Sequence, residues 1–302
     1  ADNNVYTNLM ARQNLLAAAG AAEKYPARAR ELGIDSEESA SWRDAADAMF
    51  IPYDESLGVH PQAEGFTAHQ VWDFARTPAD RYPLMLHFPY LDLYRKQVIK
   101  QPDLVLAMHL CGSAFTAEQK ARNFDYYESL TVRDSSLSAC TQAVIAAEVG
   151  QVDLAFDYLG EAALMDLRDL EHNTRDGVHI ASLAGTWIAL IDGFAGLRRQ
   201  DGIVTFAPRL PDAITRLAFC LIIRGRRLRV EVTRDKARYL LTGGEPLEIA
   251  HHGTRLTLAA GEAQERRLPP APSVARSRQP PGREPARRRA LSPLAEPSGG
   301  AR

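Results

Sequence analysis

Two serines and a histidine stand at the expected starts of two helices, where backbone N–H groups lack partners within the helix. Ser135 and Ser136 open the helical pattern over 136–149, and His179 opens the one over 180–197. Such N–H groups, hydroxyls and the positive end of the helix dipole favour an anion such as phosphate. Ordinary N-capping explains one serine equally well, and a single histidine beside apolar residues is more often a core residue. The anion interpretation therefore requires the two helix starts to meet in space.

A lysine and a glutamine precede a third helix. Pro102 suits the first helical position because its missing N–H costs nothing there, and this places Lys100 and Gln101 just before the helix. Their donors and acceptor match the vicinal hydroxyls of a sugar. The competing interpretation is a solvated connector between helices.

The loop over 57–74 mixes aromatic rings with Gln62 and Glu64. Rings that cover apolar sugar faces, with polar groups for the hydroxyls, are typical of carbohydrate sites. The same residues also suit an ordinary packed loop. His251 and His252 have no third ligand near them in the sequence, so we interpret them as a turn and expect no metal.

The remaining sequence excludes several classes of protein. It has no P-loop, GxGxxG, HExxH or GxSxG motif, and no apolar run long enough to span a membrane. Cys111, Cys140 and Cys220 lack CxxC spacing, so we expect buried thiols in a reducing cytoplasm. The net charge of −2 includes seven Arg and two Glu within 271–302. Nothing outside that segment indicates nucleic-acid binding.

The scaffold that positions these side chains is expected to be mainly helical, because the apolar spacing is helical almost throughout from residue 4 to about 200. Asp35 and Ser36 are good N-caps, and Thr116 with Gln119 forms a capping box. Short connections favour a layered or barrel-like stack of helical hairpins. Helices are expected over 4–22, 36–49, 84–96, 102–110, 116–130, 136–149, 152–171 and 180–197, with a long loop over 50–82.

After Gly202 the apolar period changes from 3.6 to 2, which indicates an antiparallel sheet or half of a sandwich. The fold class is therefore mainly α with a β-domain. We expect a helical domain over 1–201, a β-domain over 202–268 and a disordered Pro/Arg-rich tail over 269–302. Strands are expected around 204–207, 217–223, 228–232, 237–241, 247–250 and 255–258, with Gly-containing turns at 224–225, 242–244 and 252–253.

Taken together and in this order, these segments resemble glycoside hydrolase family 65, the inverting phosphorylases of maltose, kojibiose, nigerose and trehalose. The resemblance covers roughly 1–260. It is carried by the segments 2–8 (DNNVYTN), 60–66 (HPQAEGF), 100–105 (KQPDLV), 126–131 (YYESLT), 134–139 (DSSLSA), 173–187, 224–225 and 246–253.

The resemblance implies the later part of an (α/α)6 barrel followed by a C-terminal β-sheet domain, in a piece of a longer cytoplasmic protein. It assigns Ser135, Ser136 and His179 to phosphate, and Lys100 and Gln101 to the transferred glucosyl unit. The implied reaction cleaves an α-linked glucose disaccharide with inorganic phosphate as co-substrate, giving β-glucose 1-phosphate and glucose. No cofactor is expected, and the expected partners are disaccharide and phosphate, without nucleic acid or membrane.

The family's general acid is a Glu in a Gly-Pro-Asp-Glu-Tyr motif that precedes the match to 2–8. We therefore expect this residue upstream of Ala1, no catalytic residue in the chain itself, and no turnover by the chain alone. A hydrolase of the same family and an inactive carbohydrate-binding fragment stay open as alternatives. A homodimer also stays open.

Overall fold

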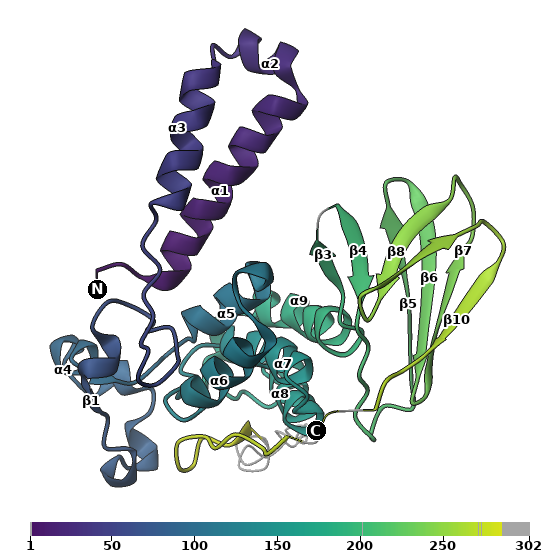
Figure 1. Cartoon of the computed structure of the whole chain (residues 1–302). Helices are drawn as coiled ribbons and strands as arrows, with labels where there is room; N and C mark the ends of the chain where they lie inside the picture. The colour runs from purple at the N-terminus through teal and green to yellow at the C-terminus, as the bar shows by residue number, and fades with distance from the viewer. Residues whose placement is uncertain (1, 201, 271, 273, 286–302) are drawn as a thin grey trace. The chain divides into compact units, whose positions relative to one another are not determined.

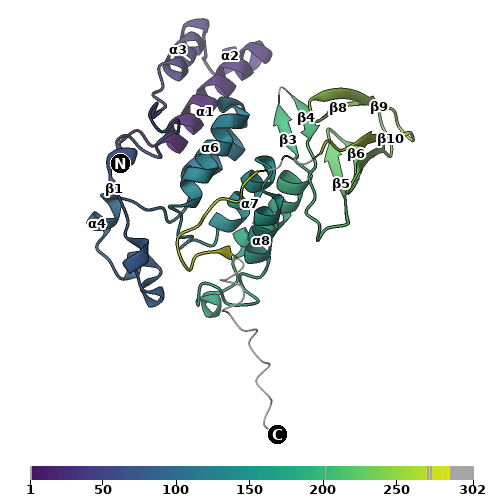
Figure 2. The same ribbon diagram turned by 60° about the horizontal axis from the view of Figure 1, so that its bottom comes forward.

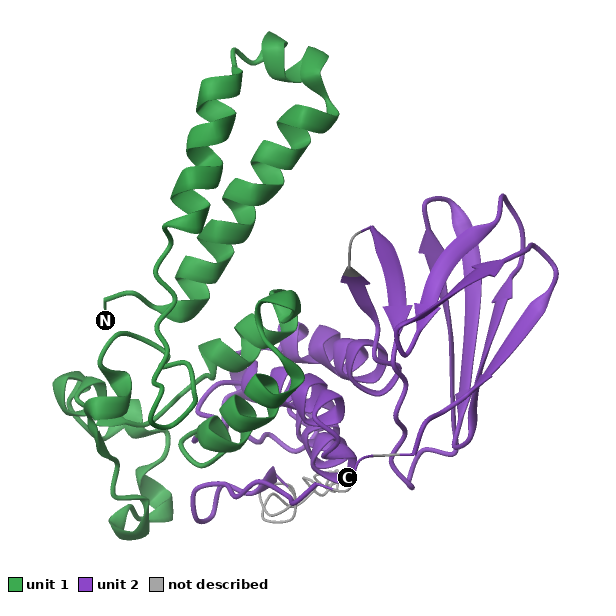
Figure 3. Ribbon diagram, viewed as in Figure 1, with its two compact units in different colours: residues 1–131 green, residues 132–302 purple. Residues whose placement is uncertain are grey.

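The computed structural model describes residues 2–200, 202–270, 272 and 274–285. The chain divides into two compact units, residues 1–131 and residues 132–302 (Figure 3). Each unit is described by itself. Both the expected helices and the expected strands are present, with the strands confined to the last third of the chain apart from two short ones (Figure 1).

Unit 1 begins with a helical hairpin, in which α1 (Val5–Lys24) and α3 (Ser36–Asp47) lie side by side (Figures 1 and 2). Both starts are capped as short polar side chains require: Asn4 Oδ1 accepts the Thr7 N–H at 3.0 Å, and Asp35 Oδ1 accepts the Glu38 N–H at 2.8 Å. The prediction for Asp35 is confirmed. A short helix that the sequence analysis missed, α2 (Pro26–Glu31), connects them.

The predicted long loop follows α3 and holds only short elements. The expected helix over 84–96 is reduced to α4 (Tyr90–Tyr94), because Pro89 sits immediately before its first residue and restricts the preceding backbone. Unit 1 ends with α5 (Asp103–Leu110) and α6 (Ala117–Glu128), whose capping box is present as predicted. The short elements are η1 (Phe66–Ala68), β1 (Gln70–Val71), η2 (Phe74–Arg76), η3 (Ala79–Arg81), η4 (Leu84–Leu86), β2 (Lys96–Gln97) and η5 (Gly112–Ala114).

Unit 2 opens with three helices, α7 (Ser138–Glu148), α8 (Val152–Ala163) and α9 (Ile180–Ile188). The predicted helix over 152–171 ends at Ala163, and turns with one short helix, η6 (Thr174–Asp176), lead to α9. The helix predicted over 180–197 continues from α9 as a π-helical turn, η7 (Ala189–Phe194).

Two four-stranded sheets follow, and they share one apolar core, so the β-part is a sandwich (Figure 1). One sheet is antiparallel in the order β10, β7, β6, β5, and the other has the order β3, β4, β8, β9 with β4 and β8 parallel. The sequence analysis missed β3 and β10, whose polar residues show no buried apolar face. The strands are β3 (Arg198–Gln200), β4 (Ile203–Phe206), β5 (Arg216–Ile223), β6 (Arg226–Thr233), β7 (Lys236–Leu241), β8 (Leu247–His251), β9 (Thr254–Leu258) and β10 (Ala263–Arg267).

Two hairpin turns confirm predictions from the sequence. Arg224 and Gly225 have φ of 49° and 78°, and His252 and Gly253 have φ of 44° and 80°. Positive φ at both central residues is the type I′ geometry, whose twist matches that of the flanking strands.

Among the cysteines, Cys111 and Cys140 are buried as expected, but Cys220 is exposed. The expectation for Cys220 is wrong because alternate residues of β5 point to opposite faces of the sheet, and the neighbouring Phe219 takes the core side.

The prediction of disorder over 269–302 is wrong for residues 274–285, which hydrogen-bond to Asp134, Gln151 and Asp157 of unit 2. The expected disorder of the last part, including the run of three arginines at 287–289, lies outside the described residues. Within the described residues, no helix combines the length and the apolar character needed to cross a membrane.

Candidate functional site

The two serines lie in the turn that leads into α7. Ser135 and Ser136 are both half-buried, and the N-cap residue of the helix is Leu137. The Ser135 carbonyl accepts the Ser138 N–H at 3.1 Å, and the Ser135 hydroxyl accepts the Leu137 N–H at 3.4 Å. The N-cap of α7 makes no side-chain hydrogen bond to the helix. The Ser135 hydroxyl thus has a local partner at the helix start, as the capping interpretation allows for one of the two serines.

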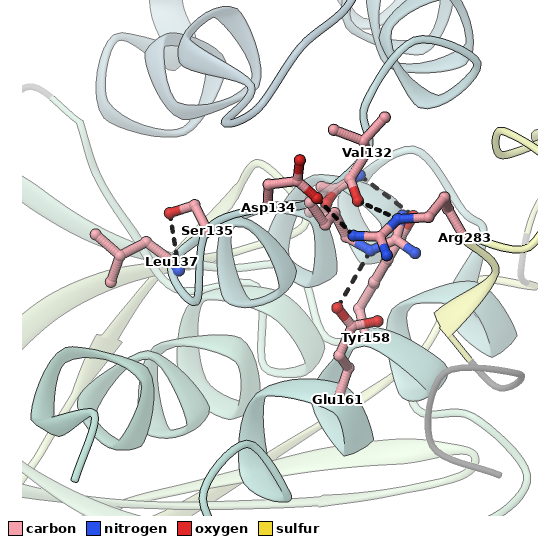
Figure 4. A network of polar contacts seen from close by, with 9 residues as sticks. Val132, Asp134, Ser135, Leu137, Tyr158, Glu161 and Arg283 are labelled. Atoms are coloured by element: carbon pink, nitrogen blue, oxygen red, sulfur yellow. Dashed lines mark hydrogen bonds and ion pairs between the residues drawn. The ribbon is translucent and has the colours of Figure 1, made fainter. Parts of the chain in front are cut away.

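A buried ion pair supports this turn from below (Figure 4). Arg133 and Glu161 of α8 are only 0% and 1% exposed, and Arg133 Nε donates to Glu161 Oε1 at 3.2 Å. The guanidinium also lies over the Tyr158 ring, 5.1 Å from its centroid, and bonds to the Tyr158 hydroxyl at 3.3 Å. Arg133 has a φ of 56°, a left-handed conformation that is costly for a residue with a Cβ. Sequence reasoning missed this pair, since its partners are 28 residues apart.

His179 stands directly before α9 and is held by a carboxylate that the sequence analysis did not single out. Asp166 Oδ1 accepts a hydrogen bond from His179 Nδ1 at 2.5 Å, and Asp166 Oδ2 accepts the backbone N–H of His179 at 2.9 Å. Both contacts fix the ring relative to the helix start. Because Nδ1 is bound to Asp166, Nε2 is the ring atom through which His179 can meet a ligand. The chain segment around Asp166 was expected to be helical, which concealed this partnership.

The two helix starts lie at the same end of unit 2. A Cβ added to Gly185 of α9 would stand 2.5 Å from Cys140 Sγ in the first turn of α7, and one added to Gly193 would stand 3.5 Å from Val144 Cα. Positions 185 and 193 thus follow α7 in the same direction as positions 140 and 144. Along this contact α7 and α9 therefore run in the same sense, so their positive ends lie on the same side of it.

Lys100 and Gln101 belong to unit 1 and lie just before α5, as predicted, but Pro102 is the N-cap of this helix and not its first residue. Lys100 is exposed and Gln101 is half-buried, and the Gln101 carbonyl accepts the Asp103 N–H at 3.0 Å. Asn4 Nδ2 donates to Asp103 Oδ2 at 3.4 Å, which joins the start of α1 to the start of α5. Burial raises the pKa of Asp103 above its usual value. Two of the segments that carry the resemblance thus meet at this point.

The loop over 57–74 is packed around a core histidine. His60 is 6% exposed, its backbone N–H donates to Asn123 Oδ1 at 2.8 Å, and its carbonyl accepts the Tyr127 hydroxyl at 2.8 Å. Burial lowers the pKa of His60. Phe66 is also buried and stacks with Tyr127. At His60 and Phe66 the packed-loop interpretation therefore holds over the sugar-binding one.

His251 and His252 contact each other in the β-sandwich, with their ring centroids 4.8 Å apart. His251 Nδ1 bonds with the Tyr239 hydroxyl at 2.8 Å, and His251 Nε2 lies 3.1 Å from the Arg267 carbonyl. Burial lowers the pKa of His252 to about 4, and His251 and Arg209 nearby act in the same direction. Their interpretation as a turn is confirmed for His252, which connects β8 to β9, but is wrong for His251, which is the last residue of β8 and pairs with Thr254.

Comparison with known proteins gives the chain a family. Residues 1–188 match the glycosyl hydrolase family 65 central catalytic domain, and residues 197–258 match the family's C-terminal domain. The first match alone covers more than half of the chain.

Curated relatives agree with these domain matches. An uncharacterized glycosyl hydrolase of Mycobacterium tuberculosis is 54% identical over 299 residues, which cover 96% of this chain and 37% of that protein. The alpha,alpha-trehalose phosphorylase of Thermoanaerobacter brockii is 39% identical, covering 86% of this chain and 35% of that protein. The maltose phosphorylase of Bacillus subtilis is 33% identical, covering 82% and 33%.

A solved structure from the human microbiome, assigned as a kojibiose phosphorylase, matches with a TM-score of 0.77 at 28% identity. The match covers 88% of this chain and 36% of that one. The chain thus spans between 33% and 37% of the length of these relatives. On its sequence, its two domain matches and its structure, the chain belongs to glycosyl hydrolase family 65.

Proposed function

We propose that this chain is the C-terminal part of an inverting disaccharide phosphorylase. The full-length protein would cleave an α-linked glucose disaccharide with inorganic phosphate to give β-glucose 1-phosphate and glucose. The observation that supports this most is that α7 and α9 run in the same sense and are preceded by Ser135, Ser136 and His179. Relatives named as trehalose, maltose and kojibiose phosphorylases support the same reaction class.

Phosphate is the nucleophile in this proposal. The Ser135 and Ser136 hydroxyls, His179 Nε2 and the N–H groups of the helix starts bind its oxygens, while Asp166 keeps the histidine ring in place. Phosphate attacks C1 of the glucosyl unit from the face opposite the leaving oxygen, so the configuration at C1 inverts from α to β. A phosphorylase needs donors at this position, whereas an inverting hydrolase needs a carboxylate base for water.

Lys100 and Gln101 are proposed to hold the glucosyl unit that is transferred. Their position just before α5, tied through Asp103 to Asn4, gives the pair a fixed backbone. The proton for the leaving oxygen would come from a Glu upstream of Ala1. The chain by itself is then expected to have negligible turnover, since loss of a general acid alone costs about 10²–10⁴-fold in rate.

The proposed architecture is the later part of an (α/α)6 barrel with its C-terminal β-domain over 202–268, in a cytoplasmic protein. The helical hairpins of the two units suit such a barrel, because its layers consist of successive antiparallel helix pairs. A homodimer is compatible with the proposal.

A hydrolase of the same family is the second candidate, because the Mycobacterium tuberculosis relative is named a glycosyl hydrolase. For the chain alone, a carbohydrate-binding fragment without turnover is the non-enzymatic candidate. The two enzymatic candidates differ in one respect that can be measured directly, the requirement for phosphate.

The test incubates the full-length protein with trehalose, maltose, kojibiose and nigerose, each with and without phosphate. We expect β-glucose 1-phosphate to form from one of them and only in the presence of phosphate. Free glucose as the only sugar product under both conditions would mean hydrolysis. The assignment of Ser135, Ser136 and His179 to phosphate would then be abandoned.

A further inference from the structure

Two residues of the segment 274–285, Arg276 and Ser277, contact α8 or the residue before it. Gln151, which precedes α8, forms two hydrogen bonds with Ser277: its Nε2 donates to Ser277 Oγ at 2.8 Å, and its Oε1 accepts the Ser277 N–H at 2.8 Å. Ser277 is 4% exposed. Arg276 pairs with Asp157 of α8 at 2.6 Å.

Pro272, shortly before this segment, already packs closely against Gly150 in the turn between α7 and α8. The φ of Gly150 is 92°, and an added Cβ would stand 2.6 Å from Cγ of Pro272. The turn between α7 and α8 thus accepts the segment only because residue 150 is glycine.

Residues 280–283 form a tight turn that ends in Arg283. The Arg283 N–H donates to the Pro280 carbonyl at 2.9 Å, and Gly282 has a φ of 80°. A type II turn requires a positive φ at its third position and commonly has proline at its second, as Gly282 and Pro281 provide here. The sequence motif Pro-Pro-Gly-Arg therefore specifies the direction in which the chain presents Arg283.

Arg283 contacts the residues directly before the serines (Figure 4). Its Nε donates to the Val132 carbonyl at 2.6 Å, and one of its terminal nitrogens lies 2.9 Å from Asp134 Oδ1. The Arg283 and Asp134 side chains are only 12% and 3% exposed. A guanidinium that bonds to a carbonyl and a carboxylate at once fixes the turn in orientation as well as in position.

The turn is thus held from two sides. Arg133 binds Glu161 of α8 beneath it, and Arg283 binds Val132 and Asp134 on either side of Arg133. Such support is what a non-glycine residue with a φ of 56° requires, because the left-handed conformation costs about 1–2 kcal/mol.

Charge gives Arg283 a second effect. Asp134 immediately precedes Ser135, so its carboxylate would repel a phosphate dianion bound by the serine hydroxyls. A guanidinium 2.9 Å from that carboxylate offsets the repulsion, and burial makes the compensation stronger than it would be in water.

We propose that residues 274–285 form a strap that positions the serine turn, with Arg283 as its positioning residue for phosphate binding. The inference rests on the proposed function for the identity of the ligand. Its structural half, that Arg283 holds residues 132–137, is independent of any ligand. Arg283 touches the turn and not the reacting atoms, so its loss should affect phosphate more than disaccharide.

The test compares Arg283→Ala with Arg276→Ala in the full-length protein. Arg276 is the matched control because it is an arginine of the same strap whose carboxylate partner, Asp157, belongs to α8 and not to the serine turn. We expect Arg283→Ala to raise KM for phosphate about 10- to 100-fold, the range for a hydrogen-bonded charge, with KM for disaccharide within about twofold. Amide hydrogen exchange over 132–137 should become about 10-fold faster or more.

Two further variants separate orientation from charge. Arg283→Lys keeps the charge but loses the fork, so its KM for phosphate should lie between those of wild type and Arg283→Ala. Asp134→Asn in the Arg283→Ala background removes the carboxylate left without its guanidinium and should recover part of the phosphate affinity.

The inference is overturned if Arg283→Ala and Arg276→Ala have the same KM for phosphate and the same exchange over 132–137. If the wild-type protein proves not to use phosphate, the proposed function fails. Exchange then decides on the strap: faster exchange in Arg283→Ala supports it, and unchanged exchange overturns it.

Discussion

Replacing Asp166 by Asn tests the proposed phosphate site through a residue that touches neither phosphate nor sugar. In the structure both carboxylate oxygens of Asp166 accept hydrogen bonds from His179, one from Nδ1 and one from the backbone N–H. Asparagine keeps an acceptor for only one of these groups and turns an N–H toward the other. We expect the ring to lose its fixed orientation and Nε2 its fixed direction.

The size of the effect follows from the burial of the pair. The side chains of His179 and Asp166 are 18% and 11% exposed, so water replaces the lost contact poorly. Hydrogen bonds to charged groups contribute about 1.5–3 kcal/mol, which corresponds to about 10- to 100-fold in a binding constant. Asp166→Asn should fall near the lower end, because one contact survives, and Asp166→Ala near the upper end.

The assay is steady-state phosphorolysis by the full-length protein, with phosphate and disaccharide varied separately. KM for phosphate should rise about tenfold in Asp166→Asn, while KM for disaccharide stays within about twofold. Asp169→Asn is the matched control, since this exposed carboxylate in the same connection binds the Thr174 N–H at 2.9 Å. Equal KM values for phosphate in the two asparagine variants would refute the assignment of His179 to phosphate.

Three further predictions concern the sugar subsite and stability. Lys100→Ala should lower kcat/KM by the equivalent of about 2–4 kcal/mol, and an unchanged value would return Lys100 and Gln101 to the role of a solvated connector. Glu161→Gln should lower the free energy of unfolding, measured in urea, by about 3–5 kcal/mol, because Arg133 keeps a buried charge. The control Glu31→Gln, in the exposed pair with Arg28, should lower it by less than about 0.5 kcal/mol. Equal losses in the two variants would contradict the role given to burial. The pKa of His252 falls to about 4 from an ordinary 6.5, so the unfolded chain binds more protons between these values and stability should decrease as pH falls through this window. His252→Asn, which tolerates the positive φ, should reduce that loss by roughly 1–3 kcal/mol between pH 7 and pH 4, and an unchanged urea midpoint difference would contradict it.

Features determined by neighbouring residues were predictable from the sequence. Asp35 caps α3, Thr116 and Gln119 form the capping box of α6, and Arg224 with Gly225 forms a hairpin turn, because each needs only residues within a few positions. The residue types at the helix starts, Ser135, Ser136 and His179, were accessible for the same reason.

Features that depend on distant partners were not predictable. Asp166 lies 13 residues before His179 in a segment whose spacing resembles a continuing helix, and Arg283 lies 149 residues from Asp134 in a Pro/Arg-rich stretch. Composition indicates disorder there because such a stretch has few apolar residues to bury. Residues 274–285 of this stretch are held instead by hydrogen bonds and ion pairs, which cannot be predicted from composition.

The shared direction of α7 and α9 has an electrostatic consequence for a ligand bound at their starts. Helices that run in the same sense bring partial positive charges of about +0.5 toward the same end, and charges of like sign disfavour each other there. A dianion between them would attract both ends and replace that repulsion. By mass action such an ion would also shift unit 2 toward its folded state. The co-substrate would then serve as a reversible structural ion, so the thermal stability of this end of the fold would follow the concentration of phosphate.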